Sequence, residues 1–451
     1  MARRKLAGII SESSSAEVRA AALRLGPHLQ NSGWLDPGNH FLSDTAANVD
    51  AEIQKGRSAA NLHSSTARAR QLAEFIAASV VLHCADGWSY LGRAQAAQLR
   101  GDIGATRHLA YYAELRAAMS LLASQGIGVF DYRHVIVKQG GAVDVFNQAG
   151  THQFAGEALK AWTRSGRSAP LVTQVIRPAG VPLSDWLSAF TQGAMAKSTG
   201  EAFLRLWGLD VEHLGADGAA RAEASYTPRT ARGCSPPPSS KALQFGTSLW
   251  KALGPDGNLS FGTLDLHLLR RSLERAYRER FNKKPSNDAA RYRTYLEAAV
   301  EAVPATLPPD RLMTFLSREH QPDDLLLLSE AEKKSPATDS ENHLHMMSRA
   351  ALLLRLSSGC ARSLLTEASL DAAELQWWSD QLAVSRALIE PREIPTIAND
   401  LWTDVADALS DLDDRISNGD DASYATLQGR CSRELSLLGG CERIALAGLA
   451  A

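Results

Sequence analysis

Cysteine is scarce in this sequence, and the few cysteines stand apart from one another. Five occur among 451 residues, and no two of them form a CxxC pair. The five are Cys84, Cys234, Cys360, Cys431 and Cys441. An odd number of isolated cysteines argues against a disulfide framework and against the common structural zinc sites. We therefore predict reduced thiols and a cytoplasmic protein.

Long apolar runs are missing as well. No stretch approaches the roughly 18 uninterrupted apolar residues that a membrane span requires. The start, MARRKLAGIISESSS, has a basic cluster but only a short apolar run before its serines, too short for the core of a signal peptide. The sequence therefore predicts no membrane partner and no export.

An excess of charge of either sign is also lacking. The net charge is −2, so no field over the whole chain attracts nucleic acid or an acidic membrane surface. Hydrophobic residues make up 45% and charged residues 22%, which is ordinary globular composition, and the length suits two or three domains. Arginine far outnumbers lysine and alanine is abundant, a bias typical of a bacterial source.

The common catalytic motifs are absent too. The sequence has no Walker A loop, no GxGxxG after a strand, no HExxH, no GxSxG elbow and no EF-hand loop. These absences argue against the commonest nucleotide-binding, zinc-protease and hydrolase classes. His83, Cys84 and Asp86, or His343 and His345, could supply metal ligands, but neither group has paired zinc spacing. We expect no metal and no cofactor.

What the sequence does contain is a strongly helical segment, HLAYYAELRAAMSLLASQG, at 108–126. At 100° per residue, one side of this helix is apolar and includes Tyr111, Leu115, Ala118, Met119 and Leu122. Three polar-tipped residues follow the same sector at i, i+4 and i+8: His108, Tyr112 and Arg116. Buried polar groups need partners, so these three form either an internal hydrogen-bond cluster that fixes helix register or a functional site.

A second segment, HLHMMSRAALLLRLSSG at 343–359, resembles the first. From Arg349 to Gly359 its spacing of arginine, alanines, leucine, serine and glycine matches that from Arg116 to Gly126. An internal duplication and a chance likeness between two Ala- and Leu-rich helices both remain open. No further copies occur, which argues against a solenoid repeat.

The rest of the chain predicts a mainly α fold with two helical-bundle modules and one small β-hairpin. Helical spacing runs from Thr66 to Cys84, a break is expected at Asp86-Gly87, and a second helix follows to Leu99. Two β-branched runs around Gly140-Gly141 predict a hairpin at 133–147. A Gly/Ala/Pro/Ser-rich stretch at 216–245 predicts a linker between an N-terminal module, 1–215, and a C-terminal module, 246–451.

The second module opens with a basic helix at 264–281. Its candidate RNA-binding residues are Arg270, Arg271, Arg275, Lys283 and Lys284. The alternative is a solvated face, with ion pairs from Glu274 to Arg278 and from Arg275 to Glu279. Of the two, we favour the solvated face.

Two short segments resemble HEPN proteins. The segment Arg57-SAANL-His63 has the spacing of the HEPN signature, an arginine followed four to six residues later by a histidine, and Arg221-AEASYTP resembles an ending found in some HEPN-like bundles. Ser58 and Ala222 stand where a polar Asn or Asp usually follows the signature arginine. HEPN proteins are helical bundles, many of them metal-independent ribonucleases of bacterial toxin and phage-defence systems. The resemblance implies a helical bundle and ribonuclease chemistry.

Two hypotheses of function follow. The first is a cytoplasmic bacterial interaction or accessory protein with a protein partner or a second copy of itself, working in phage defence or a stress response. The alternative is a HEPN-like, metal-independent ribonuclease, in which a histidine transfers protons and an arginine steadies the scissile phosphate. The candidate catalytic residues are His108, Tyr112, Arg116, Arg57 and His63.

Overall fold

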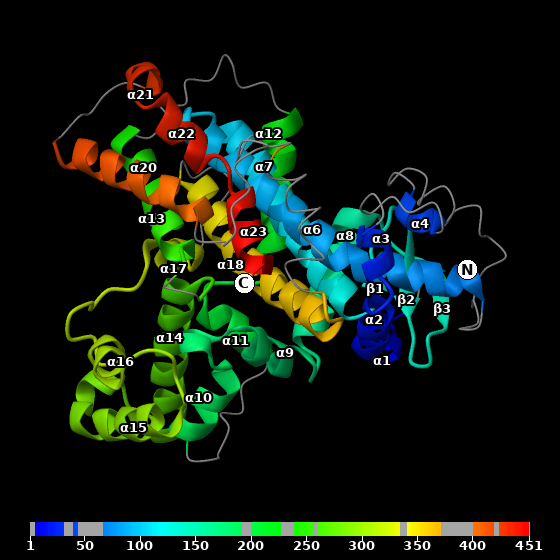
Figure 1. The fold of residues 1–451 in the computed structure, drawn as a ribbon, viewed down its shortest axis with the longest axis horizontal. Helices are drawn as coiled ribbons and strands as arrows, with labels where there is room; N and C mark the ends of the chain where they lie inside the picture. The colour runs from blue at the N-terminus through cyan, green and yellow to red at the C-terminus, as the bar shows by residue number, and fades with distance from the viewer. Residues whose placement is uncertain are drawn as a thin grey trace.

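The computed structural model describes residues 5–30, 39–43, 66–191, 200–226, 239–255, 259–333, 341–370, 384, 400–418 and 424–450. Within these ranges the chain is mainly α-helical and carries one small antiparallel sheet (Figure 1). The predicted fold class, mainly α with a small hairpin, is confirmed. None of the described helices has both the length and the apolar character needed to cross a bilayer.

Three long helices form the centre of the molecule (Figure 1). They are α6 (Ala67–Leu99), α7 (Ile103–Ser124) and α18 (Asn342–Glu367). Helix α6 begins where the Thr66 side chain accepts a hydrogen bond from the Ala69 N–H at 3.2 Å, and Asp102 caps α7 in the same way at 2.9 Å. A short turn makes α6 and α7 an antiparallel pair, and α18 packs along both. The two similar segments of the sequence therefore lie side by side, in α7 and α18.

Helix α6 runs without interruption through Asp86-Gly87, so the predicted break there is wrong. Gly87 lies where α6 meets its two neighbours: a Cβ at this position would come within 2.5 Å of Leu354 Cδ2 and 3.4 Å of the Ala113 oxygen. The glycine allows close helix packing rather than ending the helix. Tertiary contact has overridden its low helix propensity.

The predicted hairpin is present and is extended by one strand. Strands β1 (Ile127–Gly128), β2 (Arg133–Val137) and β3 (Val143–Asn147) pair in that order, all antiparallel. Val135 lies opposite Val145, and Val137 lies opposite Val143. The turn uses Gly140 and Gly141 at φ of 80° and 75°, a backbone region that favours glycine.

The remaining elements surround this centre. The N-terminal helices lie beside α6 and the sheet (Figure 1): α1 (Leu6–Glu12), α2 (Ser15–Ala22), α3 (Gly26–Gln30) and α4 (His40–Ser43). After the sheet come α8 (Thr151–Thr163), α9 (Ser168–Val175), η1 (Pro178–Gly180), α10 (Leu183–Phe190), α11 (Gly200–Leu206) and α12 (His213–Tyr226). Then follow α13 (Ser239–Leu253), α14 (Gly262–Phe281), η2 (Pro285–Asn287), α15 (Ala289–Ala302), α16 (Pro309–Leu316) and α17 (Leu326–Ala331). The last are α20 (Asp400–Ser417), α21 (Tyr424–Arg430), α22 (Ser432–Leu438) and α23 (Glu442–Ala450).

The stretch predicted as a linker, 216–245, is helical at both ends. Helix α12 extends to Tyr226 and α13 starts at Ser239, while 227–238 lie outside the described residues. Alanine has the highest helix propensity of all residues and offsets the cost of the glycines, and α12 gains further stability by packing on α7. Helices from both sides of this stretch contribute to one continuous hydrophobic core. The division into two modules stays a prediction.

Candidate functional site

Three polar residues of α12 form a row that faces α7. Asp217, Arg221 and Ser225 are spaced i, i+4 and i+8, so they lie on one side of the helix. Helix α12 runs antiparallel to α7: Arg221 lies over the rings of Tyr111 and Tyr112, and Ser225 bonds His108. Helix α12, which extends into the predicted linker, therefore places a second set of polar side chains against the α7 segment.

The row is anchored at its buried end by an ion pair to the central helix α18. Arg349 is 3% exposed and bonds both carboxylate oxygens of Asp217, with contacts of 2.7 and 3.1 Å. Glu114 of α7 lies 3.6 Å from the same guanidinium. Burial, and then the negative charge of Asp217, raise the pKa of Glu114 well above its usual value. The neutral form of Glu114 is thereby favoured, and Asp217 is the carboxylate that bonds Arg349 directly.

Arg221 occupies an unusual electrostatic position. Its Nη2 donates a hydrogen bond to His152 Nε2 at 3.2 Å, and its guanidinium carbon lies 5.5 and 5.6 Å from the ring centres of Tyr111 and Tyr112. Its Nε is buried and has no hydrogen-bond partner among the described residues. Within that part of the chain, Arg221 forms no ion pair with a carboxylate, so its charge is held in place by neutral groups.

His152, at the start of α8, links Arg221 to Tyr111. A guanidinium only donates, so His152 Nε2 must be the acceptor and Nδ1 carries the proton, which points to Tyr111 Oη at 3.0 Å. Partial burial, and then the charge of Arg221, lower the pKa of His152. Burial raises the pKa of Tyr111 to about 12. Both groups are neutral at neutral pH.

His108 stands on the other side of Tyr112. Its Nδ1 lies 2.8 Å from Ser225 Oγ, and its ring is 5.0 Å from the Tyr112 ring. Its pKa is lowered by partial burial and then by the positive charge of Arg221. We call the six residues around these contacts the His108–Arg221 cluster: His108, Tyr111, Tyr112, His152, Arg221 and Ser225.

Aromatic rings continue from the cluster along α6. The rings of Tyr90 and Tyr112 stack with centres 5.4 Å apart, and the Arg93 guanidinium lies 4.3 Å from the centre of the Tyr90 ring. We call Tyr90, Tyr112 and His108 the aromatic strip. All three residues are half-buried, and the guanidinium groups of Arg93 and Arg221 lie beside them.

The predicted catalytic residues are divided by the structure. His108 and Tyr112 meet in the cluster, but Arg116 turns toward α6, where its Nη1 lies 3.0 Å from His83 Nδ1 and its Nε lies 3.8 Å from Asp86. The spacing of eight residues leaves Arg116 about 80° from His108 around the helix, within reach of α6, and the α6 residues His83 and Asp86 hold its guanidinium there. Arg57 and His63 lie outside the described residues.

The basic helix α14 uses its first arginines inside the protein. Arg270 is 0% exposed and bonds Asp324 and the oxygens of Gln321 and Asp323, at 2.6 to 2.9 Å. Arg271 also pairs with Asp324, at 3.0 Å. Neither is free to reach an RNA phosphate in this conformation.

The other three candidates on this helix and after it are at least partly exposed. Arg275 pairs with Glu279 as predicted, at 2.6 Å, and Lys283 lies 3.5 Å from Asp288. Lys284 is exposed. Glu274 pairs with Arg318 rather than with Arg278. RNA contact by Arg275, Lys283 and Lys284 stays a prediction.

Sequence reasoning missed His152 and placed Tyr111 only in the core. No pattern in the sequence linked Arg221 to His108. One local signal was available: Asp217, Arg221 and Ser225 repeat at the helical interval of four. The Gly/Ala-rich composition around them hid it.

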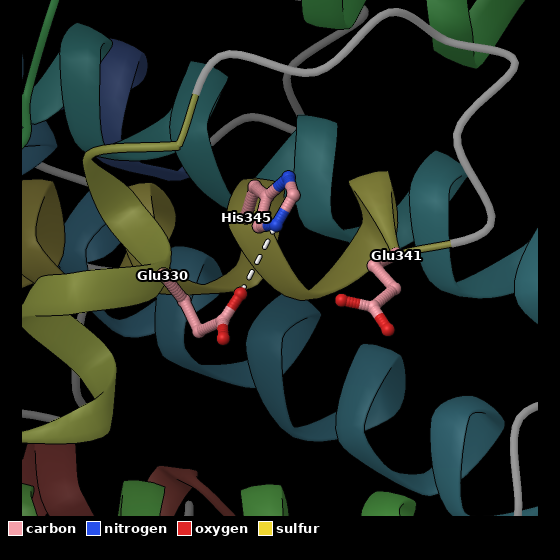
Figure 2. Close-up of side chains that lie close together, drawn as sticks. All are labelled: Glu330, Glu341 and His345. Atoms are coloured by element: carbon pink, nitrogen blue, oxygen red, sulfur yellow. Dashed lines mark ion pairs between the residues drawn. The ribbon is translucent and has the colours of Figure 1, made fainter.

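One further group could hold a metal ion. Glu330, Glu341 and His345 place ligand atoms within 4.8 Å of one another, and Figure 2 shows the ion pair between Glu330 and His345 with Glu341 on its other side. Each carboxylate already has a cationic partner, Lys333 at 2.7 Å for Glu330 and Lys241 for Glu341. These ion pairs offset the two negative charges, and nothing in the geometry calls for a metal there.

Comparison with known proteins gives no match: no family model, no curated protein and no solved structure is significantly similar to this chain.

Proposed function

We propose that the His108–Arg221 cluster binds a phosphate of single-stranded RNA and cleaves the RNA strand without a metal ion. The observation that carries this proposal is Arg221, a cation held by neutral rings and a neutral histidine beside a second histidine. A phosphate would supply the negative charge that the described surroundings of Arg221 do not. Of the two hypotheses of function, we therefore prefer the metal-independent ribonuclease to the interaction or accessory protein.

The arginine is suited to phosphate because its planar donors match phosphate oxygens better than an ammonium does. His152 and Tyr111 fix the orientation of that plane before any ligand arrives, which lowers the entropy lost on binding. His152 is therefore a positioning residue for Arg221. A bound phosphate would also oppose the effect of Arg221 on both histidines and raise their pKa values.

His108 is the residue we assign to proton transfer. Ser225 engages Nδ1, so the transfer uses Nε2. Neutral His108 takes the proton of the ribose 2′-hydroxyl while the 2′-oxygen forms a bond to phosphorus. The bond from phosphorus to the 5′-oxygen breaks, and that oxygen takes a proton from water or from the protonated His108. The products are a 2′,3′-cyclic phosphate and a 5′-hydroxyl.

The aromatic strip supports a single-stranded substrate. Unpaired bases stack on exposed aromatic rings and on arginine planes, and each such contact adds affinity without requiring a particular sequence. Tyr90, Tyr112 and Arg93 lie next to the proposed phosphate position. A paired duplex would not offer its base faces to them.

One of the two segments that resemble HEPN proteins contributes residues to the cluster. Arg221 and Ser225 of one resembling segment belong to the cluster, whereas Arg57 and His63 of the other are outside the described residues. HEPN-like descent and a role in bacterial phage defence or stress response remain proposals. An interaction or accessory role, with a protein partner or a second copy, is the proposal that stands if no RNA chemistry is found.

Cleavage of a short single-stranded RNA in excess chelator tests the proposal. We expect cleavage by the full chain and a loss of about 100-fold or more in rate for His108→Ala and for Arg221→Ala. His320→Ala and Arg293→Ala, which remove exposed residues of the same types far along the chain, serve as matched controls and should leave the rate unchanged.

Two outcomes would contradict the proposal. If all variants purified alike cleave RNA at one rate, the activity does not come from this cluster. If the full chain neither binds nor cuts the RNA, the ribonuclease proposal is wrong and the interaction role stands.

A further inference from the structure

A pocket rich in arginine lies at the C-terminal half of α18, away from the His108–Arg221 cluster. It has a volume of about 390 Å³ and lies between the end of α9, the start of α14, α18 and α23. Three arginines line it: Arg177, Arg355 and Arg362. A pocket of this size suits a small metabolite.

Arg355 is the fixed, buried part of the pocket. It is 4% exposed, bonds both carboxylate oxygens of Asp265 at 2.6 and 2.8 Å, and donates to the Val175 oxygen at 3.0 Å. Asp265 also accepts from the backbone N–H of Arg177 at 2.9 Å. The Asp265 charge is therefore offset by Arg355, and their ion pair forms a rigid floor.

The other carboxylate in the pocket lining, Glu367, is also accounted for. It pairs with Arg19 of α2 at 2.8 Å and accepts a hydrogen bond from Ser363 at 3.3 Å. With Asp265 and Glu367 each balanced by an arginine, Arg177 and Arg362 supply two uncompensated positive charges. Neither forms an ion pair within the described part of the chain.

The surroundings of Arg362 are consistent with an excess of positive charge in the pocket. It is half-buried, and its pKa is lowered by burial and then by the positive charges of Arg355 and Arg177. Like charges held together in a recess repel one another, and an anion placed among them relieves that repulsion. Thr366 also lines the pocket, and its hydroxyl can donate a hydrogen bond to such an anion.

We propose that this pocket binds a small phosphate-bearing anion, inorganic phosphate or a phosphomonoester, with Arg177 and Arg362 contacting the phosphate. The pair of cations matches the charge of nearly two on a phosphomonoester at neutral pH. This site is independent of the proposed RNA chemistry, because it shares no residue with the His108–Arg221 cluster.

Calorimetric titration of the full chain tests the pocket, with inorganic phosphate, ribose 5-phosphate and ribose as the three probes. We expect both phosphates to bind and ribose not to. Tighter binding of ribose 5-phosphate would identify a phosphomonoester as the ligand, and equal binding would identify inorganic phosphate. Arg362→Gln and Arg177→Gln should each weaken phosphate binding about tenfold or more.

Controls separate this result from a folding defect and from the first site. Arg293→Gln, an exposed arginine on α15, and His108→Ala should bind phosphate like the unchanged chain. Arg177 is exposed, so its substitution should leave the melting temperature unchanged even if Arg362→Gln lowers it. The proposal is overturned if neither phosphate binds, if ribose binds as tightly as the phosphates, or if Arg177→Gln leaves the phosphate affinity unchanged.

Discussion

At the scale of the residue, burial keeps the His134 side chain neutral at neutral pH. His134 of β2 is fully buried, accepts from the Phe130 N–H at Nδ1 at 3.1 Å, and has its Nε2 2.8 Å from the Ala149 oxygen. Protonation would place a hydrogen on Nδ1 against that N–H. Burial is the main cause that lowers the pKa of His134 to about 4.

This histidine should make folding depend on pH. Its pKa is about 4 in the folded chain and about 6.5 when unfolded, so between these values the unfolded state binds the extra proton. Stability from this group is therefore present above pH 6.5 and is lost as pH falls, by about 2 kcal/mol between pH 7 and pH 5. Urea unfolding of the full chain and of His134→Gln at both pH values measures the difference.

The variant should lose less stability than the unchanged chain over this interval, whatever its stability at pH 7. His320→Gln, at an exposed histidine, should keep the full pH dependence. Equal slopes for the unchanged chain and His134→Gln would show that His134 does not titrate as the structure implies.

At the scale of the element, the glycines of α6 act as contact surfaces. Gly92 faces the turn after α22: a Cβ there would lie 2.3 Å from the Gly439 oxygen and 2.8 Å from the Cys441 nitrogen. Both are backbone atoms, which cannot move aside as the end of a side chain can. The glycine lets α6 meet this turn directly.

Replacing Gly92 should therefore reverse the usual effect of Gly→Ala in a helix. Alanine normally stabilises a helix interior by about 0.5–1 kcal/mol, but Gly92→Ala should destabilise the protein by about 1–3 kcal/mol through overpacking. Gly104→Ala in α7 is the matched control, since its nearest neighbour would be Asp102 Oδ1 at 3.6 Å. Thermal unfolding that ranks Gly92→Ala above Gly104→Ala in stability would contradict this packing.

At the scale of the whole molecule, α18 joins the two sides of the predicted linker. From the N-terminal side, Trp88 of α6 donates a hydrogen bond to Ser358 of α18 at 2.9 Å, and the Ala117 oxygen of α7 accepts one from Ser357 at 3.0 Å. From the predicted linker and the C-terminal side, Asp217 of α12 pairs with Arg349 at 2.7 Å, and Asp265 of α14 pairs with Arg355 at 2.6 Å. These residues are buried, and the hydrophobic core around them is continuous. These contacts favour one cooperative unit over two independent modules.

We expect calorimetry to show a single unfolding transition for the full chain. Arg349→Ala leaves the Asp217 carboxylate buried without its cation, so it should lower that transition as a whole, by about 3–5 kcal/mol. Two transitions, of which only one shifts in the variant, would restore the two-module prediction. Arg293→Ala, at an exposed ion pair, should shift neither.

The sequence alone determined the features that depend on neighbouring residues. Helical spacing located the α7 and α18 segments, and the Gly140-Gly141 turn with its β-branched flanks located the hairpin. These elements form through contacts within about four residues, or across one turn, and the spacing of residue types along the sequence predicts such contacts. The same pattern set His108 and Tyr112 on one side of a helix.

Only the tertiary structure decided what those side chains meet. His108, His152 and Arg221 come from α7, α8 and α12, and no local spacing relates them. Gly87 continues a helix because Leu354 packs against it, and Arg270 is inside because Asp324 lies opposite. Each outcome depends on which helix faces come together, and that choice is set by packing between residues far apart in the chain.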